Sequence, residues 1–376
     1  MRHSYTSAVP TSATALATRE AVRTAILAAA AMLVVVLVMA SAQGGPAYFI
    51  QLGERSTALE FARETLGADV PTPVADGHDG ESFWLLARDP TLSGGDDLAQ
   101  YFDRPLYRAQ RIGYPALASP WGLGGEESLL WGLVLTNVIA VAVGTFLVGS
   151  TVIRAGGSKL AGYLFVANPL VWLAVLFDFS DAVALAGLVG VVWALRRGRP
   201  GAAGAFGVLA ALAKDSSLLG LVSLAVLTRH LSLRDRLEVV LPAVAAAGLW
   251  RLYVMAQPGF TSDPEIQEFA LVPFSGFAEA WRRGWSPQGD WVYAALSLAL
   301  IPLAAAIVWT WWRRRGSMEL AAALPYAVFV PFLSGQVLSI PINSYRAIGP
   351  ALTLAAAGRL VERPRTEPPG TPPRAG

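Results

Sequence analysis

The chain contains no cysteine among its 376 residues and only three histidines, His3, His78 and His230. Without cysteine it forms no disulfide, carries no thiolate and holds no metal through sulfur. The scattered histidines do not have the spacing of a zinc site. Charged residues are also scarce, at 15 %, against about 25 % in soluble domains. The apolar share of 54 % instead indicates a protein that crosses a membrane several times.

A net charge of +2 is too small to favour nucleic acid as a partner, so the bilayer is the first expected partner. A membrane-spanning helix needs about 20 apolar residues. Eight stretches meet or approach that length: 24–42, 128–150, 160–177, 181–195, 237–256, 291–312, 318–340 and 346–361. The fold class predicted from them is an all-α, polytopic integral membrane protein.

The stretch 201–228 is ambiguous because two apolar runs flank Lys214 and Asp215, while arginines stand at both outer ends. With both ends on one side of the membrane, the segment crosses twice or re-enters as a short helical hairpin. Counting it as two short spans predicts about ten transmembrane helices.

Arginine clusters predict the orientation, because short cytoplasmic loops are enriched in Lys and Arg. One orientation, with both termini cytoplasmic, places every such cluster inside: Arg154 and Lys159, 196–199, 229–236 and 313–315. Two long loops, 43–127 and 257–290, then lie outside. The sequence thus predicts one transmembrane domain over 1–361, a disordered cytoplasmic tail over 362–376, and multi-pass residence in the plasma membrane with a site facing outward.

Three features lie in or near these loops, and the first and the last of them have competing interpretations. Ala40, Ser41 and Ala42 resemble a signal-peptide cleavage site, but the preceding apolar core is longer than the usual 7–15 residues, which favours a membrane anchor. Residues 54–67 have the pattern of an amphipathic helix at the membrane surface. Tryptophans in 257–290 suit an interfacial flap better than a sugar-stacking surface.

The first outer loop carries a dense group of acids whose members are Asp76, Asp79, Glu81 and Asp89. Asp79 precedes an aromatic and apolar run, so a helix is expected to begin near it. Its carboxylate is either a helix cap or a general base that takes a proton from an acceptor hydroxyl. The same acids could hold a divalent cation, but their spacing defines no metal site, and no cofactor is expected.

Arg104, Arg108 and Arg111 recur at intervals of three and four residues and would share one face of a helix. Guanidinium groups bind phosphate oxygens in pairs, so this face suits a phosphate site as well as a solvated arginine stripe. Lys214 and Arg346 are two further cations at helix ends on the same predicted outer side. Ionisable groups at such depth are costly and mark candidate functional sites, while the alternative interpretation is a capped hairpin tip at Lys214 and a snorkelling side chain at Arg346.

These motifs resemble those of the multispanning glycosyltransferases of the type-C fold (GT-C), and more closely a set of bacterial membrane proteins related to them. The matching stretches are 78–84, Asp89-Pro90, 107–115, 212–218 and 345–350. The chain departs from the pattern at His78, where a tyrosine is usual, and at Glu81 and Ser82.

The resemblance implies that a sugar moves from a polyprenyl-phosphate donor to a cell-envelope glycan or protein acceptor at the outer face, with inversion. Asp79 would be the base. Arg108, Arg111, Lys214 and Arg346 would bind the donor phosphate, and the remaining motif residues would contact the acceptor or support the site: Asp76, Glu81, Asp89, Gln110 and Tyr114. The alternatives are a transporter or flippase for lipid-linked glycans and a non-catalytic protein that keeps the GT-C architecture.

Overall fold

The computed structural model describes residues 11–261, 263, 268–286 and 290–361, and over these residues the fold is all-helical with two isolated β-bridges. Four helical segments are long and apolar enough to cross a membrane: Ala15–Ala42, Glu126–Arg154, Leu233–Met255 and Trp291–Arg313. A 29-residue helix such as the second spans roughly 43 Å, more than the hydrocarbon core requires. The protein is therefore a membrane protein. The predicted tail at 362–376 lies outside the described residues.

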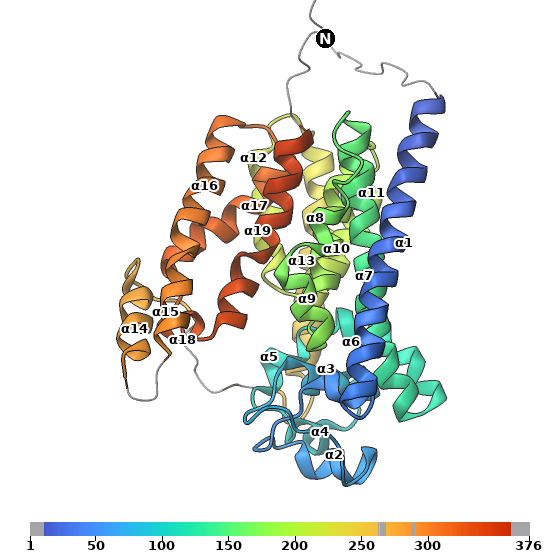
Figure 1. Ribbon diagram of the computed structural model, residues 1–376, viewed down its shortest axis with the longest axis vertical. Coiled ribbons are helices and arrows are strands. Elements are labelled where there is room, and N and C mark those ends of the chain that lie inside the picture. The colour runs from blue at the N-terminus through green and yellow to red at the C-terminus, as the bar shows by residue number, and fades with distance from the viewer. Residues whose placement is uncertain (1–10, 262, 264–267, 287–289, 362–376) are drawn as a thin grey trace, which may run out of the picture.

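The centre of the fold is α10 (Asp181–Leu195), which is buried along almost its whole length. On one side of it, α1 (Thr11–Ala42) packs along α7 (Glu126–Arg154), and α11 (Pro200–Ala213) packs between α10 and α13 (Leu233–Met255). On the other side lie α12 (Ser217–Leu227), α16 (Leu300–Arg313), α17 (Met318–Phe329) and α19 (Pro341–Val361), with α17 contacting the other three (Figure 1).

The first outer loop forms a cap of short helices at one end of this bundle (Figure 1). Its elements, in chain order, are η1 (Pro46–Ile50), α2 (Leu59–Leu66), α3 (Asp79–Arg88), α4 (Gly95–Ala99), α5 (Pro105–Ala109), α6 (Gly113–Ala118) and η2 (Ser119–Gly124). The amphipathic helix expected over 54–67 is shorter than predicted and begins at Leu59. It packs through Phe61 against Trp84 and Tyr101, within the cap.

Two predicted spans are interrupted. Residues 160–177 form α8 (Tyr163–Val166) and α9 (Pro169–Leu176), because the Asn168 side chain accepts the Leu170 N–H and Pro169 starts a new helix. Residues 318–340 form α17, η3 (Val330–Phe332) and α18 (Gly335–Leu338). The stretch 201–228 forms α11 and α12, which contact each other and are separated at Lys214, a break that both two short spans and a re-entrant hairpin require.

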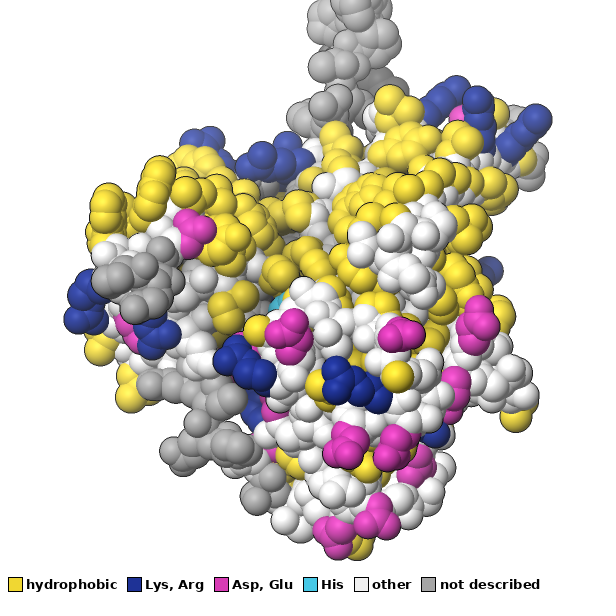
Figure 2. All heavy atoms as spheres, turned by 60° about the horizontal axis from the view of Figure 1, so that its bottom comes forward, with side chains coloured by type: hydrophobic (Ala, Val, Ile, Leu, Met, Phe, Trp, Pro, Cys, Tyr) yellow, Lys and Arg dark blue, Asp and Glu magenta, His cyan; other side chains and the backbone are white. Residues whose placement is uncertain are grey.

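The second outer loop contributes α14 (Ser275–Gly284) and leads into α15 (Trp291–Leu298). Trp281, Trp285 and Trp291 are exposed, and their rings are adjacent. With the cap turned toward the viewer, acidic side chains are scattered over its surface, and broad hydrophobic surfaces lie behind it on the bundle (Figure 2).

The opposite end of the bundle is rich in arginine. Arg196 binds Glu319 through Nε and Nη2 at 2.6 and 2.7 Å, and Arg314 donates to the backbone carbonyl of Arg359 at 2.8 Å. Partial burial lowers the pKa of Arg197, and the nearby Arg154 and Arg199 lower it further. The clusters that predict the cytoplasmic side therefore gather at the end opposite the cap.

Candidate functional site

Helix α3 begins at Asp79, as the sequence predicted, but the Asp79 carboxylate does not cap it. The position before it, the N-cap, is occupied by His78. The hydrogen bonds to the Asp79 carboxylate come from three guanidinium groups: Arg108, Arg111 at 3.4 Å and Arg346 at 2.6 Å. The side chain of Asp79 is 11 % exposed. Of the two interpretations of Asp79, the helix cap is therefore wrong.

Close packing at Gly80 holds Asp79 in this position. A Cβ on Gly80 would lie 2.7 Å from the backbone oxygens of both Ile50 and Phe177, which is too close for any real side chain. Only glycine lets the first turn of α3 rest against η1 and the end of α9. The carboxylate one residue earlier is thereby placed at the junction between cap and bundle.

Of the three arginines predicted to share a helix face, Arg104 and Arg111 stack on the ring of Tyr107, although helix α5 is only five residues long and contains neither of them. The guanidinium carbons of Arg104 and Arg111 lie 3.8 and 4.0 Å from the ring centre. Arg111 also donates to the Tyr107 hydroxyl. Arg108 turns the other way and binds Asp103 through Nε and Nη2 at 2.8 and 2.9 Å. The single helix that would place all three arginines on one face is not formed, because α5 ends at Ala109. Arg104 and Arg111 meet at an aromatic ring, and Arg108 binds Asp103 and Asp79 instead.

The second outer loop fixes the start of α5. Asp263 accepts the backbone N–H groups of Leu106 and Tyr107 at 2.9 and 2.8 Å, and Glu268 binds Arg104 at 3.3 Å. A carboxylate at a helix N-terminus satisfies free N–H groups and is favoured by the helix dipole. The arginine-bearing segment is therefore positioned by both outer loops.

A second buried carboxylate, Asp181, stands at the first turn of α10 and is fully buried. It accepts hydrogen bonds from Lys214, in the turn between α11 and α12, and from Nε of Arg346 at 2.8 Å. Gly113 brings the cap close here, since a Cβ on it would lie 2.6 Å from the backbone nitrogen of Ala213. Arg346 therefore joins the two carboxylates, and these contacts unite α3, α5, α10, the α11–α12 turn and α19 in one charged cluster.

The buried part of this cluster holds more positive than negative charge. Its four cations, Arg108, Arg111, Lys214 and Arg346, have side chains that are 6 to 13 % exposed, and they face two buried carboxylates. Two further carboxylates lie at the rim of the cluster, where the side chains of Asp103 and Asp215 are 56 % and 49 % exposed. Asp215 lies 3.7 Å from Nε of Arg111. Arg111 Nε is buried and makes no hydrogen bond. The interior thus has the excess positive charge that would attract an anion.

The same charges set the ionisation of Asp79. Burial raises the pKa of Asp79, but Arg346, Arg108 and Arg111 outweigh burial and hold that pKa well below its usual range. Burial lowers the pKa of Lys214, and the neighbouring Asp181 offsets this only in part. Asp79 is ionised at neutral pH and is a weak base as long as all three arginines bind it.

Aromatic rings form one wall of the cluster. The Arg346 guanidinium lies 4.0 Å from the centre of the Phe179 ring. His78 packs near Phe177 and Phe179, with ring centres 5.6 and 5.9 Å away. His78 therefore belongs to this wall.

The five predicted supporting residues lie outside the cluster. Asp76 is exposed and pairs with Arg55 at 2.6 Å. Asp89 accepts the backbone N–H of Gly94 at 2.8 Å and so stabilises the turn that follows it. The Gln110 side chain accepts a hydrogen bond from Arg251 on α13 at 2.7 Å. Tyr114 is buried and donates to the Leu133 carbonyl at 2.9 Å and to Asp178 at 3.2 Å.

Glu81, the fifth, points to the cap interior and accepts the Gly53 N–H at 3.3 Å. Burial raises its pKa to about 7, although hydrogen bonds from Ser56 and Gly53 oppose that shift. Within the described residues, no three histidine, aspartate or glutamate side chains group closely enough to hold a metal ion.

Sequence reasoning singled out neither Asp181 as a partner of the cations nor Tyr107 as the centre of the arginines. Asp263 and Glu268 of the second outer loop were missed as well. The one signal available for Asp181 was an acid at the start of an apolar helix, on the same predicted side as Lys214.

The chain was compared with known proteins at three levels. No protein-family model, no curated protein and no solved structure matches it. The case for function therefore rests on the charged cluster itself.

Proposed function

We propose that the protein is a membrane glycosyltransferase of the GT-C kind, which moves a sugar from a polyprenyl-phosphate donor to a cell-envelope acceptor. The observation that carries the proposal is the convergence of four buried cations on Asp79 and Asp181 at the cap end of a membrane bundle. Such a cluster suits a substrate that is anionic, membrane-anchored and reached from the cap side. The resemblance of the motifs to GT-C proteins supports the same class.

In this proposal the donor phosphate binds to Arg108, Arg111, Lys214 and Arg346. These cations stabilise the negative charge that develops on the phosphate oxygen as the bond to the sugar breaks. The buried Nε of Arg111 makes no hydrogen bond and has only Asp215 nearby, at 3.7 Å, so it is one donor that the phosphate could engage. Arg346 and Arg108 also bind Asp79, so the phosphate competes with that carboxylate for them.

This competition gives Asp79 a way to act as base. When a phosphate draws the guanidinium groups away, their effect on the pKa of Asp79 weakens, and burial then makes the carboxylate more basic. Asp79 takes the proton of the acceptor hydroxyl, the hydroxyl oxygen bonds to the anomeric carbon, and the bond from that carbon to the phosphate oxygen breaks. The sugar is inverted, and polyprenyl phosphate leaves with the bonding electrons.

The proposal includes about ten spans, a single domain over 1–361 and a bacterial plasma-membrane location with both termini cytoplasmic. The four long helices provide part of that number, and the shorter apolar helices, including α11 and α12, provide the rest. Gathering of the arginine clusters at the end opposite the cap supports the orientation.

A second candidate is a structural clasp without catalysis. The observation that favours it is internal pairing, since each of the four cations already contacts a carboxylate of the chain. In that case the cluster only fastens the cap and α19 to α10. A flippase for lipid-linked glycans has no comparable observation in its favour.

The test is donor turnover by membranes that contain the wild-type chain or Asp79→Asn at equal protein level, supplied with labelled polyprenyl-phosphate sugars. Loss of turnover in Asp79→Asn alone is the expected result. Asp76→Asn is the matched control, because Asp76 is a nearby exposed acid outside the cluster. Arg111→Ala should mainly raise the donor KM. Equal turnover in the wild type and Asp79→Asn would remove Asp79 as base, and no turnover with any donor would favour the clasp.

A further inference from the structure

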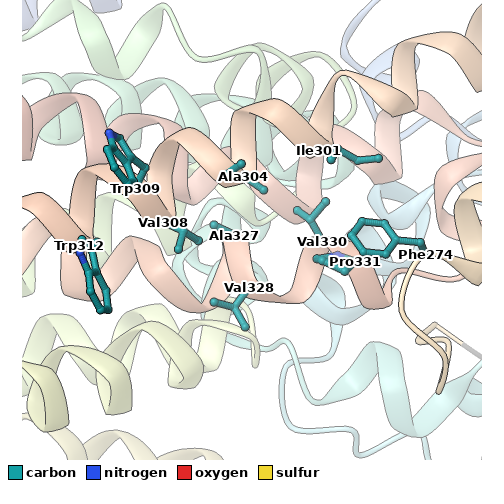
Figure 3. Close-up of a pocket in the computed structure, with 11 residues that line it drawn as sticks. Phe274, Ile301, Ala304, Val308, Trp309, Trp312, Ala327, Val328, Val330 and Pro331 are labelled. Carbon is teal, nitrogen blue, oxygen red and sulfur yellow. The ribbon is translucent and has the colours of Figure 1, made fainter.

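An apolar groove of about 430 Å³ lies between α16 and α17, away from the charged cluster (Figure 3). Ile301, Ala304 and Val308 line it from α16, while Ala327 and Val328 line it from α17. The segment Trp291–Arg313 is only 28 % buried, so this side of α16 faces the surroundings of the bundle. In a membrane-spanning segment those surroundings are lipid.

The groove has two different ends. Trp309 and Trp312 stand at one end, and Phe274 with Pro331 closes the other (Figure 3). From Ile301 to Trp312, α16 rises roughly 16 Å, close to half of the ~30 Å hydrocarbon thickness. The groove therefore accommodates a chain from one leaflet only.

The open end of the groove carries positive charge. The guanidinium carbon of Arg313 lies 4.5 Å from the Trp309 ring centre, and that of Arg315 lies 3.6 Å from the Trp312 ring centre. Both arginines are exposed, and neither forms an ion pair with a carboxylate of the described chain. Tryptophan and arginine side by side are typical of the membrane interface, where phosphate headgroups lie.

We propose that this groove is a binding site for an anionic glycerophospholipid of the leaflet at the arginine-rich end. One acyl chain fills the groove between α16 and α17, and the headgroup phosphate binds Arg313 and Arg315. Apolar lining, a length of one leaflet and two unpaired cations at the open end together fit a phospholipid of net negative charge. A zwitterionic lipid would fill the same groove but gain less from the arginines.

The groove does not suit the lipid donor of the proposed reaction. Its cations lie at the arginine-rich end, whereas the cluster of Asp79 and Arg346 lies at the cap end. A donor whose phosphate occupied the cluster would enter with the reverse polarity. The phospholipid site is therefore independent of the proposed function.

The experiment is native mass spectrometry of the full-length protein in mild detergent, titrated separately with dioleoyl phosphatidylglycerol, dioleoyl phosphatidylcholine and a polyprenyl phosphate. We expect phosphatidylglycerol to bind at least about 10-fold more tightly than phosphatidylcholine. In the double variant Arg313→Gln/Arg315→Gln its affinity should fall about 30-fold, the effect of two arginines beside an anionic headgroup. Ala305→Leu, which places a larger side chain in the groove, should weaken both phospholipids.

Matched control variants distinguish binding at this groove from nonspecific electrostatic attraction between the protein and an anionic lipid. Arg199→Gln/Arg229→Gln removes two exposed arginines elsewhere, and Ala306→Leu enlarges an exposed neighbour that does not line the groove. Both should leave the preference intact. Equal binding of the two phospholipids by the wild type, or an equal loss in the control variants, would overturn the proposal. So would tighter binding of polyprenyl phosphate that Ala305→Leu abolishes, since the groove would then belong to the donor.

Discussion

Arg346 Nη2 lies 2.6 Å from Asp79 Oδ2, so α19, the last helix of the described chain, is tied to the first turn of α3 in the cap. The same guanidinium reaches Asp181 through Nε at 2.8 Å. The Arg346 side chain thereby compensates the negative charge of two buried carboxylates, one in α3 and one in α10. The stability of the cap and the chemistry of the site depend on the same contact.

Replacing Arg346 with Gln should destabilise the folded protein by about 3–5 kcal/mol, because it leaves buried carboxylates with incomplete compensation. The side chains of Arg346 and Asp79 are 10 % and 11 % exposed, so solvent does little to screen the loss. Denaturation in mixed micelles measures the change. Arg55→Gln, which breaks the exposed pair with Asp76, should cost less than about 1 kcal/mol. Equal effects of the two substitutions would contradict a buried cluster.

Glu81 should make the protein less stable as pH rises from about 4.5 to about 7. Its pKa is raised by burial from 4.5 to about 7, so the folded state binds a proton that the unfolded state has already released. The stabilisation is complete below pH 4.5, is lost through pH 7 and amounts to about 3 kcal/mol at most. Melting curves between pH 4.5 and 8 measure it. Glu81→Gln should flatten the profile over that interval, whereas Asp76→Asn should leave it unchanged.

Gly80→Ala should destabilise the cap and lower any activity of the site together. The added Cβ would collide with the carbonyl oxygens of Ile50 and Phe177 at 2.7 Å, so α3 must move away and take Asp79 with it. We expect a loss of about 1–3 kcal/mol, as for other overpacked sites. Gly248→Ala in α13 is the control, because its Cβ meets nothing within 4 Å, and alanine there should stabilise the helix by up to about 1 kcal/mol. A neutral Gly80→Ala would show that α3 docks less closely.

Asp178→Asn should leave the protein as stable as the wild type at neutral pH, or more stable. Burial raises the pKa of Asp178 well above its usual range although Tyr114 donates a hydrogen bond to it, so its charged form is unfavourable inside the protein. Asparagine keeps the acceptor for Tyr114 and tolerates the backbone φ of 48°. Asp178→Ala removes that acceptor and should cost about 1–3 kcal/mol. Melting temperatures at pH 5 and 8 compare the variants, and a large loss in Asp178→Asn at both would contradict a neutral carboxyl group.

Some features of the fold and of the site could be predicted from the sequence because they depend on residues that lie close together in the chain. The start of α3 at Asp79 follows from residues that are near neighbours in the chain, whereas the helix face predicted for Arg104, Arg108 and Arg111 is absent because α5 ends at Ala109. The break between α11 and α12 follows from two polar residues between apolar runs. The apolar stretches likewise predicted an all-helical membrane protein.

Other features depend on contacts between distant segments, which no single-sequence pattern records. Asp181 meets Arg346 across 165 positions, and Asp263 meets the N–H groups of α5 across more than 150. The interruption of 160–177 at Asn168 also has a tertiary cause, since its side chain donates to the Gly349 carbonyl at 2.7 Å. Hydropathy averaged along the sequence detects the apolar residues around Asn168 but cannot detect α19, the helix whose Gly349 carbonyl binds its side chain.

The bridge made by Arg346 also bears on how the protein is made. During translation the cap and α10 are synthesised long before residue 346. Until α19 is made, Asp79 and Asp181 have only Arg108, Arg111 and Lys214 as cationic partners. Insertion of α19 then completes the set. Assembly of the charged cluster is therefore a late event of biogenesis, and the cap should resist proteases only after the α19 segment has joined the bundle.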